Sequence, residues 1–251
     1  MGTMSSPNWL RRYRDGQREQ VWHELRQLGS TILDFDLAEE AQLVCDEMAL
    51  RARRNIEVIV DRLSEGGYQF HTNDDDQTQV VPFIPATARA AEHASWLRER
   101  FDSVPMTLLS WVRLVGDVWL VGTHPDWPES SSGDPLVIQV EGSHYPESSI
   151  RGYFTDELDS WSKRNDRHPG ARRFVLPLAP DRYHKENVSG GDPYGIALPD
   201  GCVDGLFVAG STMPFVSYLN WVFGSGGFPW PSGSDAQWRV CHALREDMLP
   251  L

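Results

Sequence analysis

The chain has 251 residues and a mass of 28.4 kDa, with 40% hydrophobic and 24% charged residues. This composition is typical of a folded globular protein and excludes a disordered chain, and the length suits one large domain or a core with an extension. Acidic residues outnumber basic ones by 36 to 23, which gives a formal net charge of −13. Direct binding of nucleic acid needs clustered lysine and arginine, so we expect no nucleic-acid ligand.

Two other classes are disfavoured by the sequence. No apolar run approaches the roughly 20 residues that span a bilayer, and residues 1–14 are polar. We therefore expect no membrane contact and a cytoplasmic location. The cysteines Cys45, Cys202 and Cys241 are far apart and lack CxxC spacing, so we expect packing thiols rather than a disulfide or a zinc site.

The N-terminal part predicts helices. Apolar residues recur at helical spacing from Arg11 to Leu28 and again from Leu37 to Glu65. Asp36 and Glu39 form a capping box at the start of the second helix, and Gly66-Gly67 supply its stop. A short strand at Tyr68–Phe70 is expected to follow.

The segment from His71 to Gln79 contains Asp74-Asp75-Asp76, which invites a calcium interpretation. The glycine at position six and the terminal glutamate of an EF-hand loop are both missing from it. We therefore expect a solvated loop here.

The rest of the chain predicts a mixture of helices and strands. Proline-flanked helices are expected at Thr87–Phe101 and Val104–Leu114. Apolar or alternating runs then predict five strands, at Asp117–Val121, Leu136–Val140, Arg173–Leu178, Tyr194–Leu198 and Leu206–Val208. Helices at Phe215–Phe223 and Asp235–Met248 close the chain. The fold class is therefore α+β, with a mostly antiparallel sheet flanked by helices. We expect a helical N-terminal region, 1–101, packed on an α+β core domain, 102–251.

Histidine and carboxylate side chains suggest one enzymatic alternative. His124, Asp126, His144 and His184, with Asp181 near the last of them, could converge as a metal-dependent or hydrolytic site. Their spacing matches no compact ligand motif such as HExxH, and the chain has no GxSxG elbow for a serine nucleophile. A small-molecule hydrolase or metal enzyme stays open as the alternative, while the expected state is a chain without metal or cofactor.

Charge is concentrated in one stretch of the sequence. Residues 102–160 contain ten acidic residues against Arg113 and Arg151, a local net charge of −8, with aromatic residues between them. Aromatic anchors in an acidic field are what an interface for a basic protein would use. The residues expected to bind such a partner are Trp127, Glu129, Glu141, Tyr145, Glu147, Asp156, Glu157, Asp159 and Trp161.

Part of the sequence resembles a known superfamily. Val104-Pro105, Trp111-Val112 and Val115-Gly116 lead into an expected strand, and Phe215-Val216-Ser217-Tyr218-Leu219 follows the sheet. In these segments the chain resembles the SUKH superfamily, over roughly residues 102–230 of this sequence. Around Tyr183-His184-Lys185, Ser189-Gly190-Gly191 and Gly226-Gly227-Phe228-Pro229 it is also similar to a group of uncharacterised bacterial proteins. This sequence lacks the Asn-Gly-Gly that often closes the first SUKH helix and adds a helical N-terminal region.

The resemblance implies a non-enzymatic α+β binding domain, commonly an immunity protein that neutralises a bacterial toxin, often a nuclease. The acidic balance of the chain is compatible with a basic toxin, because proteins that act on nucleic acids carry lysine and arginine. A regulatory scaffold that uses the same binding surface is left open, as is the oligomeric state.

Overall fold

The structure is a computed structural model, and it describes residues 8–143, 149–167, 173–231 and 233–251. Its helices are α1 (Trp9–Arg14), α2 (Arg18–Gln27), α3 (Phe35–Glu65), α4 (Ala90–Arg100), α5 (Met106–Leu114), α6 (Ile150–Arg167), α7 (Arg182–Lys185), α8 (Phe215–Gly224) and α9 (Asp235–Leu244), with 3-10 turns η1 (Gly29–Leu33) and η2 (Ser130–Gly133). Its strands are β1 (Gln69–Phe70), β2 (Phe83–Pro85), β3 (Gly116–Trp119), β4 (Gly122–Thr123), β5 (Val137–Ile138), β6 (Phe174–Ala179), β7 (Tyr194–Leu198), β8 (Leu206–Ala209) and β9 (Ser211–Pro214).

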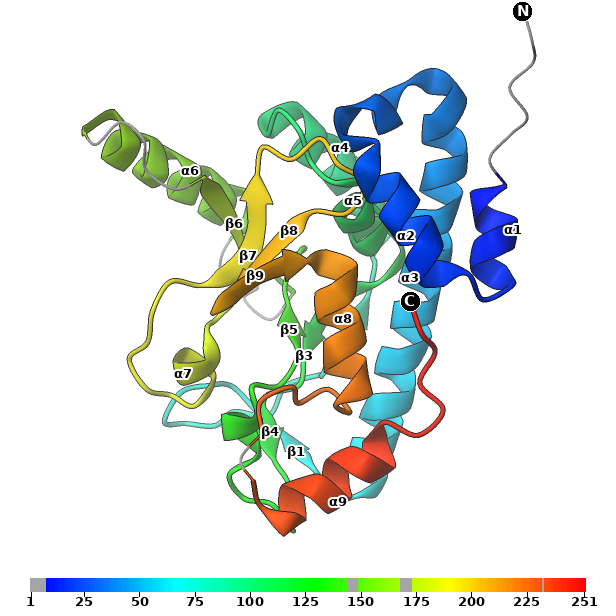
Figure 1. Cartoon of the computed structure of the whole chain (residues 1–251). Coiled ribbons are helices and arrows are strands. Elements are labelled where there is room, and N and C mark those ends of the chain that lie inside the picture. Colours follow the sequence, from blue (N-terminus) through cyan, green and yellow to red (C-terminus); the bar gives the residue numbers. More distant parts are fainter. Residues whose placement is uncertain (1–7, 144–148, 168–172, 232) are drawn as a thin grey trace, which may run out of the picture.

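The strands form antiparallel sheets in the orders β1-β4, β2-β3-β5 and β6-β7-β8-β9. Helix α3 runs along one side of the sheets and α6 lies on the other, while α8 crosses in front of them in Figure 1. This arrangement confirms the α+β class expected from the sequence. Strands β1 and β2 pair with β4 and β3, so hydrogen bonds join the segment before residue 101 to the segment after it. The proposed division at residue 101 stays a prediction.

Helix α3 is the longest element, because its apolar residues recur on one face and nothing interrupts them. Val44, Met48, Ile56, Ile59 and Leu63 are all buried on that face. The helix covers the predicted 37–65 and begins slightly earlier. The predicted capping box is wrong, since Asp36 lies inside the first turn and Asp34 occupies the N-cap position without a side-chain bond to the helix.

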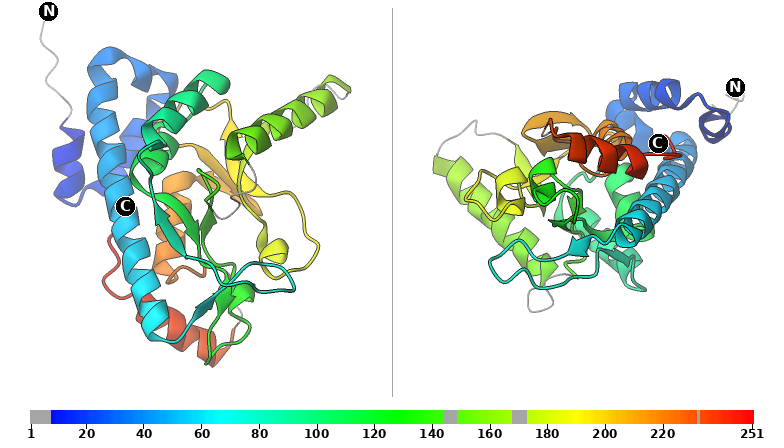
Figure 2. Two further views of the ribbon diagram at one scale, coloured as in Figure 1. Left: turned by 180° about the vertical axis from the view of Figure 1, so that it is seen from behind. Right: turned by 90° about the horizontal axis from the view of Figure 1, so that it is seen from below.

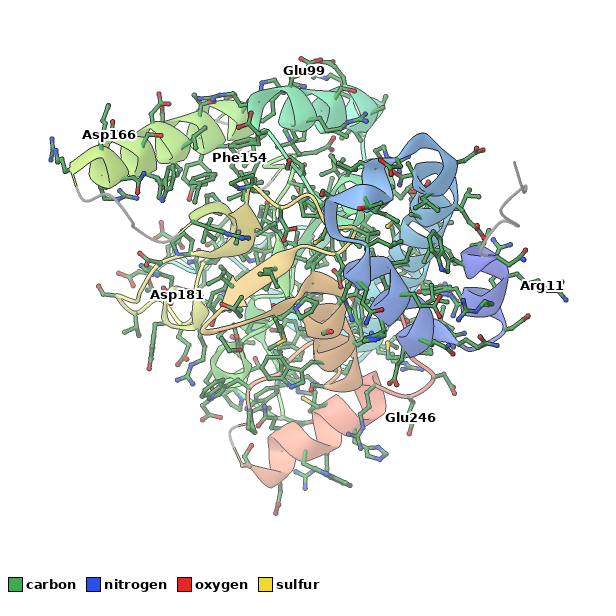
Figure 3. The ribbon with its side chains drawn as sticks, turned by 45° about the horizontal axis from the view of Figure 1, so that its top comes forward. Arg11, Glu99, Phe154, Asp166, Asp181 and Glu246 are labelled. Carbon is green, nitrogen blue, oxygen red and sulfur yellow. The ribbon has the colours of Figure 1, made fainter. Side chains whose placement is uncertain are left out.

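Other sequence expectations need correction. The helix expected from Arg11 to Leu28 is broken into α1 and α2 at Asp15–Gln17. The elements expected from the sequence include no helix at 150–167, where α6 forms, although Ile150, Phe154, Leu158 and Trp161 recur there at helical spacing and pack against the core. Figure 3 shows Phe154 on the inner side of α6 and Asp166 near its far end, which extends away from the rest of the protein.

One glycine is needed for the connection between α5 and β3. Gly116 has a φ of 103°, and a side chain there would place its Cβ 2.3 Å from the carbonyl oxygen of Ile84 on the paired strand. Glycine is the residue that adopts this conformation without steric cost and lets β2 approach so closely. No helix in the described part of the chain has the length and apolarity needed to cross a bilayer.

A buried ion pair ties α2 to the second half of the chain. Arg26 Nη2 lies 2.7 Å from Asp204 Oδ2, and the other carboxylate oxygen accepts the amide of Val216 at the start of α8. The Asp204 side chain is fully buried, and burial raises its pKa to about 6, against the opposing effect of Arg26.

This raised pKa predicts a pH dependence of stability. Between about pH 4 and pH 6 the folded chain binds more protons at Asp204 than the unfolded chain does, so this group stabilises the fold progressively as the pH falls. Urea unfolding of the wild type and of Asp204→Asn from pH 7 to pH 4 checks this. The wild type should gain stability relative to the variant on acidification, and a constant difference would contradict the assignment.

Candidate functional site

The candidate site is built around α7, a helix of one turn that follows β6. Asp181 caps it, since Oδ1 accepts the amides of Tyr183 at 2.7 Å and His184 at 3.1 Å. Its other oxygen lies 2.7 Å from Nδ1 of His184. Burial alone would raise the pKa of Asp181, yet the hydrogen bonds from His184 and the two amides outweigh it and lower that pKa below its ordinary value. A Cβ at Gly190 would meet Asp181 Oδ1 at 2.2 Å, so the returning chain needs glycine there.

A buried lysine anchors α7 from beneath. Lys185 is 1% exposed, and its Nζ lies 2.6 Å from Oδ1 of Asp134, which follows η2. The ammonium group also lies 5.0 Å from the ring centroid of Tyr194, whose hydroxyl is 3.3 Å from Asp134 Oδ2. Burial raises the pKa of Tyr194, with the Asp134 carboxylate acting in the same direction. The positive charge of Lys185 and the negative charge of Asp134 compensate each other. The surface formed by the outward side chains of α7 therefore has no net charge buried beneath it.

The acidic loop between β1 and β2 lies against α7. Asn73 Nδ2 donates to the carbonyl of His184 at 2.8 Å, and Asn187 Nδ2 donates to Asp75 Oδ1 at 2.6 Å. Inside the loop, Asp74 Oδ1 accepts from the hydroxyl of Thr72 and from two backbone amides. These bonds fix Asp74, Asp75 and Asp76 at the surface beside α7, as the positions of the loop and helix in Figure 1 also show.

Two exposed aromatic rings flank the same helix. Tyr183 is 51% exposed and Trp230 is 46% exposed. The guanidinium carbon of Arg182 lies 4.9 Å from the Tyr183 ring centroid and 4.5 Å from that of Trp230. Arg182 also lies 3.3 Å from Glu186, so the two rings and the carboxylate are held in one stack by a single arginine.

We call this surface the acidic face. It consists of Asp74, Asp75, Asp76, Glu129, Tyr183, Glu186 and Trp230. A polar pocket of about 280 Å³ opens among the acidic loop, η2 and α7, with Asp74, Glu129 and Glu186 in its lining. Seen from below, the loop, η2 and α7 gather at one end of the protein beside α9 (Figure 2). Three acidic side chains therefore line this hollow, and Arg182 links one of them, Glu186, to the two exposed aromatic rings.

The two aromatic residues expected as anchors that lie within the described residues are buried or half-buried. Trp127 is 1% exposed, with its ring centroid 5.3 Å from that of Phe228 in the core, so the expected exposed anchor at this position is wrong. Trp161 is half-buried and packs edge-on against Phe174. Tyr145 lies outside the described residues. Apolar surface in the 102–160 segment was needed for the core, which accounts for the burial of these rings.

The acidic residues expected at the interface are dispersed. Glu129 belongs to the acidic face, whereas Glu141 accepts hydrogen bonds from the amide and hydroxyl of Thr87. Asp156, Glu157 and Asp159 lie on α6, where Asp159 pairs with Arg100 at 3.3 Å. Glu147 lies outside the described residues. Two further acids of the segment, Asp117 and Asp134, are buried, so the local net charge of −8 does not form one surface.

The enzymatic alternative gains no support from the geometry. His124 and Asp126 border a pocket between α3 and α9, whereas His184 pairs with Asp181 on α7. Burial lowers the pKa of His124, against the opposing effect of Asp126. His144 lies outside the described residues. Within the described ranges, no three His, Cys, Asp or Glu side chains are grouped closely enough to hold a metal ion.

The acidic face combines residues that the sequence analysis treated separately. The Asp74–Asp76 tract was expected to be a solvated loop, and it is exposed, but its position beside Tyr183 and Trp230 follows only from the fold. One sequence signal does point to Trp230, because Pro229 and Pro231 on either side exclude it from a helix interior or a central strand. An aromatic residue in such a segment is a candidate for surface recognition.

The chain was compared with protein-family models, curated proteins and solved structures, and none of the three comparisons gave a match.

The ion pair beneath α7 generates a stability prediction. Asp134→Asn leaves Lys185 buried without a compensating charge, so unfolding should become easier by about 3–5 kcal/mol. Asparagine tolerates the left-handed backbone at this position, where φ is 57°, so the loss should come from the charge. Urea unfolding at pH 7 measures it.

The matched control is the double variant Asp134→Asn with Lys185→Met, which removes the stranded charge and should recover part of the lost stability. A single variant within about 1 kcal/mol of the wild type would show that the pair does not hold α7 in place.

Proposed function

We propose that this chain is a protein-binding module that recognises a basic protein through the acidic face. In its most concrete form it is a bacterial immunity protein that neutralises a basic toxin, such as a nuclease. The observation that carries the proposal is a group of four exposed carboxylates around one hollow, those of Asp74, Asp75, Asp76 and Glu129, near two exposed aromatic rings that Arg182 contacts. Carboxylates steer a basic partner, and exposed tyrosine and tryptophan are the side chains that most often anchor interfaces.

The balance of charge supports a basic rather than an acidic partner. Lys185 is neutralised by Asp134, and Arg182 is turned to Glu186 and the two rings. The resemblance of residues 102–230 to the SUKH superfamily points in the same direction, since its domains are commonly immunity proteins. The net charge of −13 adds a long-range attraction to any basic protein.

The proposal is tested in two steps. The immobilised chain captures proteins from the source cell at low salt, and those released by 1 M salt are identified by mass spectrometry. Each basic protein recovered is then expressed alone and together with this chain. We expect the partner to arrest growth when alone and to be harmless when this chain is present. Growth arrest that this chain does not relieve would refute the immunity form of the proposal.

The charges of the face should control the rate of association. Replacing Asp75 and Asp76 by Asn and Glu129 by Gln should slow association with the partner about tenfold at low salt. The effect should fade near 1 M salt, where the Debye length is about 3 Å. Stopped-flow or surface-plasmon measurements at several salt concentrations check this.

The matched control replaces Asp156 and Asp159 by Asn and Glu157 by Gln, which removes the same charge from α6. This variant should slow association much less than the first variant does, because none of its three acids belongs to the acidic face and only Asp156 lies near Tyr153 on α6. If it slows association while the first variant does not, the partner binds α6, as the sequence predicted, and the acidic face is the wrong surface.

The aromatic rings should control dissociation. Trp230→Ala should cost about 2 kcal/mol or more of binding free energy at any salt concentration, mostly through faster dissociation. Trp238→Ala is the matched control, because Trp238 on α9 is also exposed and lies outside the acidic face as defined. Equal losses for the two variants would argue against Trp230 as a specific anchor.

A further inference from the structure

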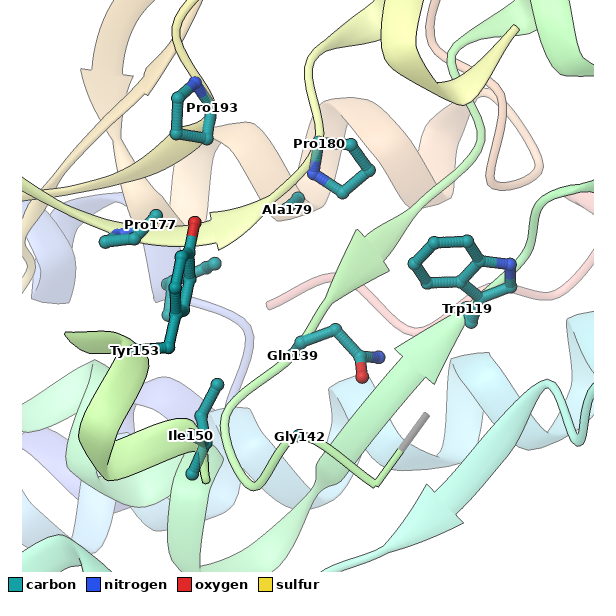
Figure 4. Close-up of a pocket in the computed structure, with 10 residues that line it drawn as sticks. Trp119, Gln139, Gly142, Ile150, Tyr153, Pro177, Ala179, Pro180 and Pro193 are labelled. Atoms are coloured by element: carbon teal, nitrogen blue, oxygen red, sulfur yellow. The ribbon is translucent and has the colours of Figure 1, made fainter. Parts of the chain in front are cut away.

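A second, apolar pocket lies where two of the sheets meet. Figure 4 shows Trp119 of β3 and Gln139 after β5 on one side, and Pro177, Ala179 and Pro180 along β6 on the other. Ile150 and Tyr153 from the first turns of α6 close it. The amide of Gln139 donates to the carbonyl of Leu178 at 2.7 Å, which joins the two sheets at the pocket.

The walls of this pocket are held by hydrogen bonds. Trp119 is buried, and its Nε1 donates to the carbonyl of His71 at 2.9 Å. The buried carboxylate of Asp117 accepts the amides of Val140, Glu141 and Ser143, which fixes the turn that contributes Gly142 to the lining. These hydrogen bonds hold Trp119 and Gly142 in place in the lining of the pocket.

The lining selects an uncharged, apolar occupant. Among the described residues that line it, none is charged, and the side-chain amide of Gln139 donates to the carbonyl of Val118. The rings of Trp119, Tyr153 and three prolines line the space (Figure 4). Such surfaces favour an aromatic or aliphatic group and penalise a charged one.

Size and access fit one side chain. The pocket has a volume of about 350 Å³, whereas a dry cavity of about 150 Å³ is enough for benzene. Tyr153 at the rim is 43% exposed, and Pro193 on the opposite rim is also exposed, so the space opens to solvent. A phenylalanine ring could enter with part of the segment that carries it.

Among the described residues, two exposed acids lie beside the pocket. Asp156 lies one turn after Tyr153 on α6, and Asp192 directly precedes Pro193, with both acids exposed. The nearest basic residue of α6, Arg151, is paired with Glu92 at 3.0 Å. The pocket also adjoins the acidic face, because Pro180 leads into α7 and Trp119 bonds to His71, which lines the polar pocket.

We propose that this pocket receives one apolar side chain of the basic partner, of phenylalanine size, carried between lysine or arginine residues. This inference rests on the proposed function and specifies the chemistry of the partner's contact segment. The ring fills the uncharged pocket while the flanking cations meet the carboxylates at its rim. The partner would therefore be recognised by a basic-aromatic-basic segment rather than by charge alone.

The test uses three peptides as probes, each with capped ends and titrated calorimetrically at low salt and in 1 M salt. The first has phenylalanine between two pairs of lysines, the second has alanine at the centre, and the third has phenylalanine between pairs of serines. The wild type should bind the first peptide about tenfold more tightly than the second. A ratio of this size is expected when one aromatic ring is buried on binding. The first should also bind more tightly than the third at low salt, with the difference shrinking in 1 M salt.

Two exposed aromatic residues provide matched variants. Tyr153→Ala removes a wall of the pocket and should bring the ratio of the affinities for the phenylalanine and alanine peptides close to one. Trp238 lies outside both the pocket and the acidic face, so Trp238→Ala should leave that ratio unchanged. Ala179→Leu, which fills the pocket from β6, should act like Tyr153→Ala, and circular dichroism shows whether each variant is folded.

Equal binding of the phenylalanine and alanine peptides by the wild type would overturn this inference, as would a preference that survives Tyr153→Ala in the folded variant. Equal binding of the lysine and serine peptides at low salt would also overturn it, because the flanking charge would then play no part. None of these results decides the proposed function, which depends on the native partner and on the acidic-face variants.

Discussion

The acidic face depends on one buried ion pair, that of Lys185 with Asp134. Lys185 lies at the end of a one-turn helix that cannot be stable by itself, since a single turn fixes more backbone angles than its hydrogen bonds repay. Its ammonium group instead holds the turn to η2, and the capping carboxylate of Asp181 holds the other end. The acidic loop and Trp230 are then attached to α7 through Asn73, Asn187 and Arg182. A break in the pair would remove the contact between α7 and η2 on which this arrangement depends.

Carboxylates have two distinct roles in this protein, and burial separates them. Asp117, Asp134 and Asp204 are buried, and each joins separate segments through hydrogen bonds or an ion pair, while the buried Asp181 caps α7. The carboxylates of the acidic loop are exposed and contribute to the electrostatic field, although Asp75 also accepts a hydrogen bond from Asn187. A count of charges along the sequence does not distinguish buried from exposed carboxylates. For this reason the net charge of residues 102–160 predicted a binding surface that this segment does not form.

Much of the fold could be predicted from local patterns. Helices α3 and α8 have long apolar stripes, and the strands β6, β7 and β8 fall on the expected apolar runs. Helix α6 was missed although Ile150, Phe154, Leu158 and Trp161 recur at helical spacing, because its charged residues and Trp161 were interpreted as a binding surface. The candidate site was harder still, since its members come from residues 74 to 230 and their neighbourhood depends on long-range pairing. Trp127 shows the limit most clearly, as an aromatic residue in an acidic segment that serves the core.

The stack of Tyr183, Arg182 and Trp230 has a consequence for the thermodynamics of recognition. A long arginine or an exposed tryptophan normally loses rotamer freedom when a partner immobilises it, at about 0.5–1.5 kcal/mol for each side chain. Here the guanidinium group already lies within 5 Å of both ring centroids before any partner arrives, since the two distances are 4.9 and 4.5 Å. If a partner binds these rings in this arrangement, less rotamer freedom is left to lose, and the conformational-entropy penalty of association should be smaller than for unpaired side chains.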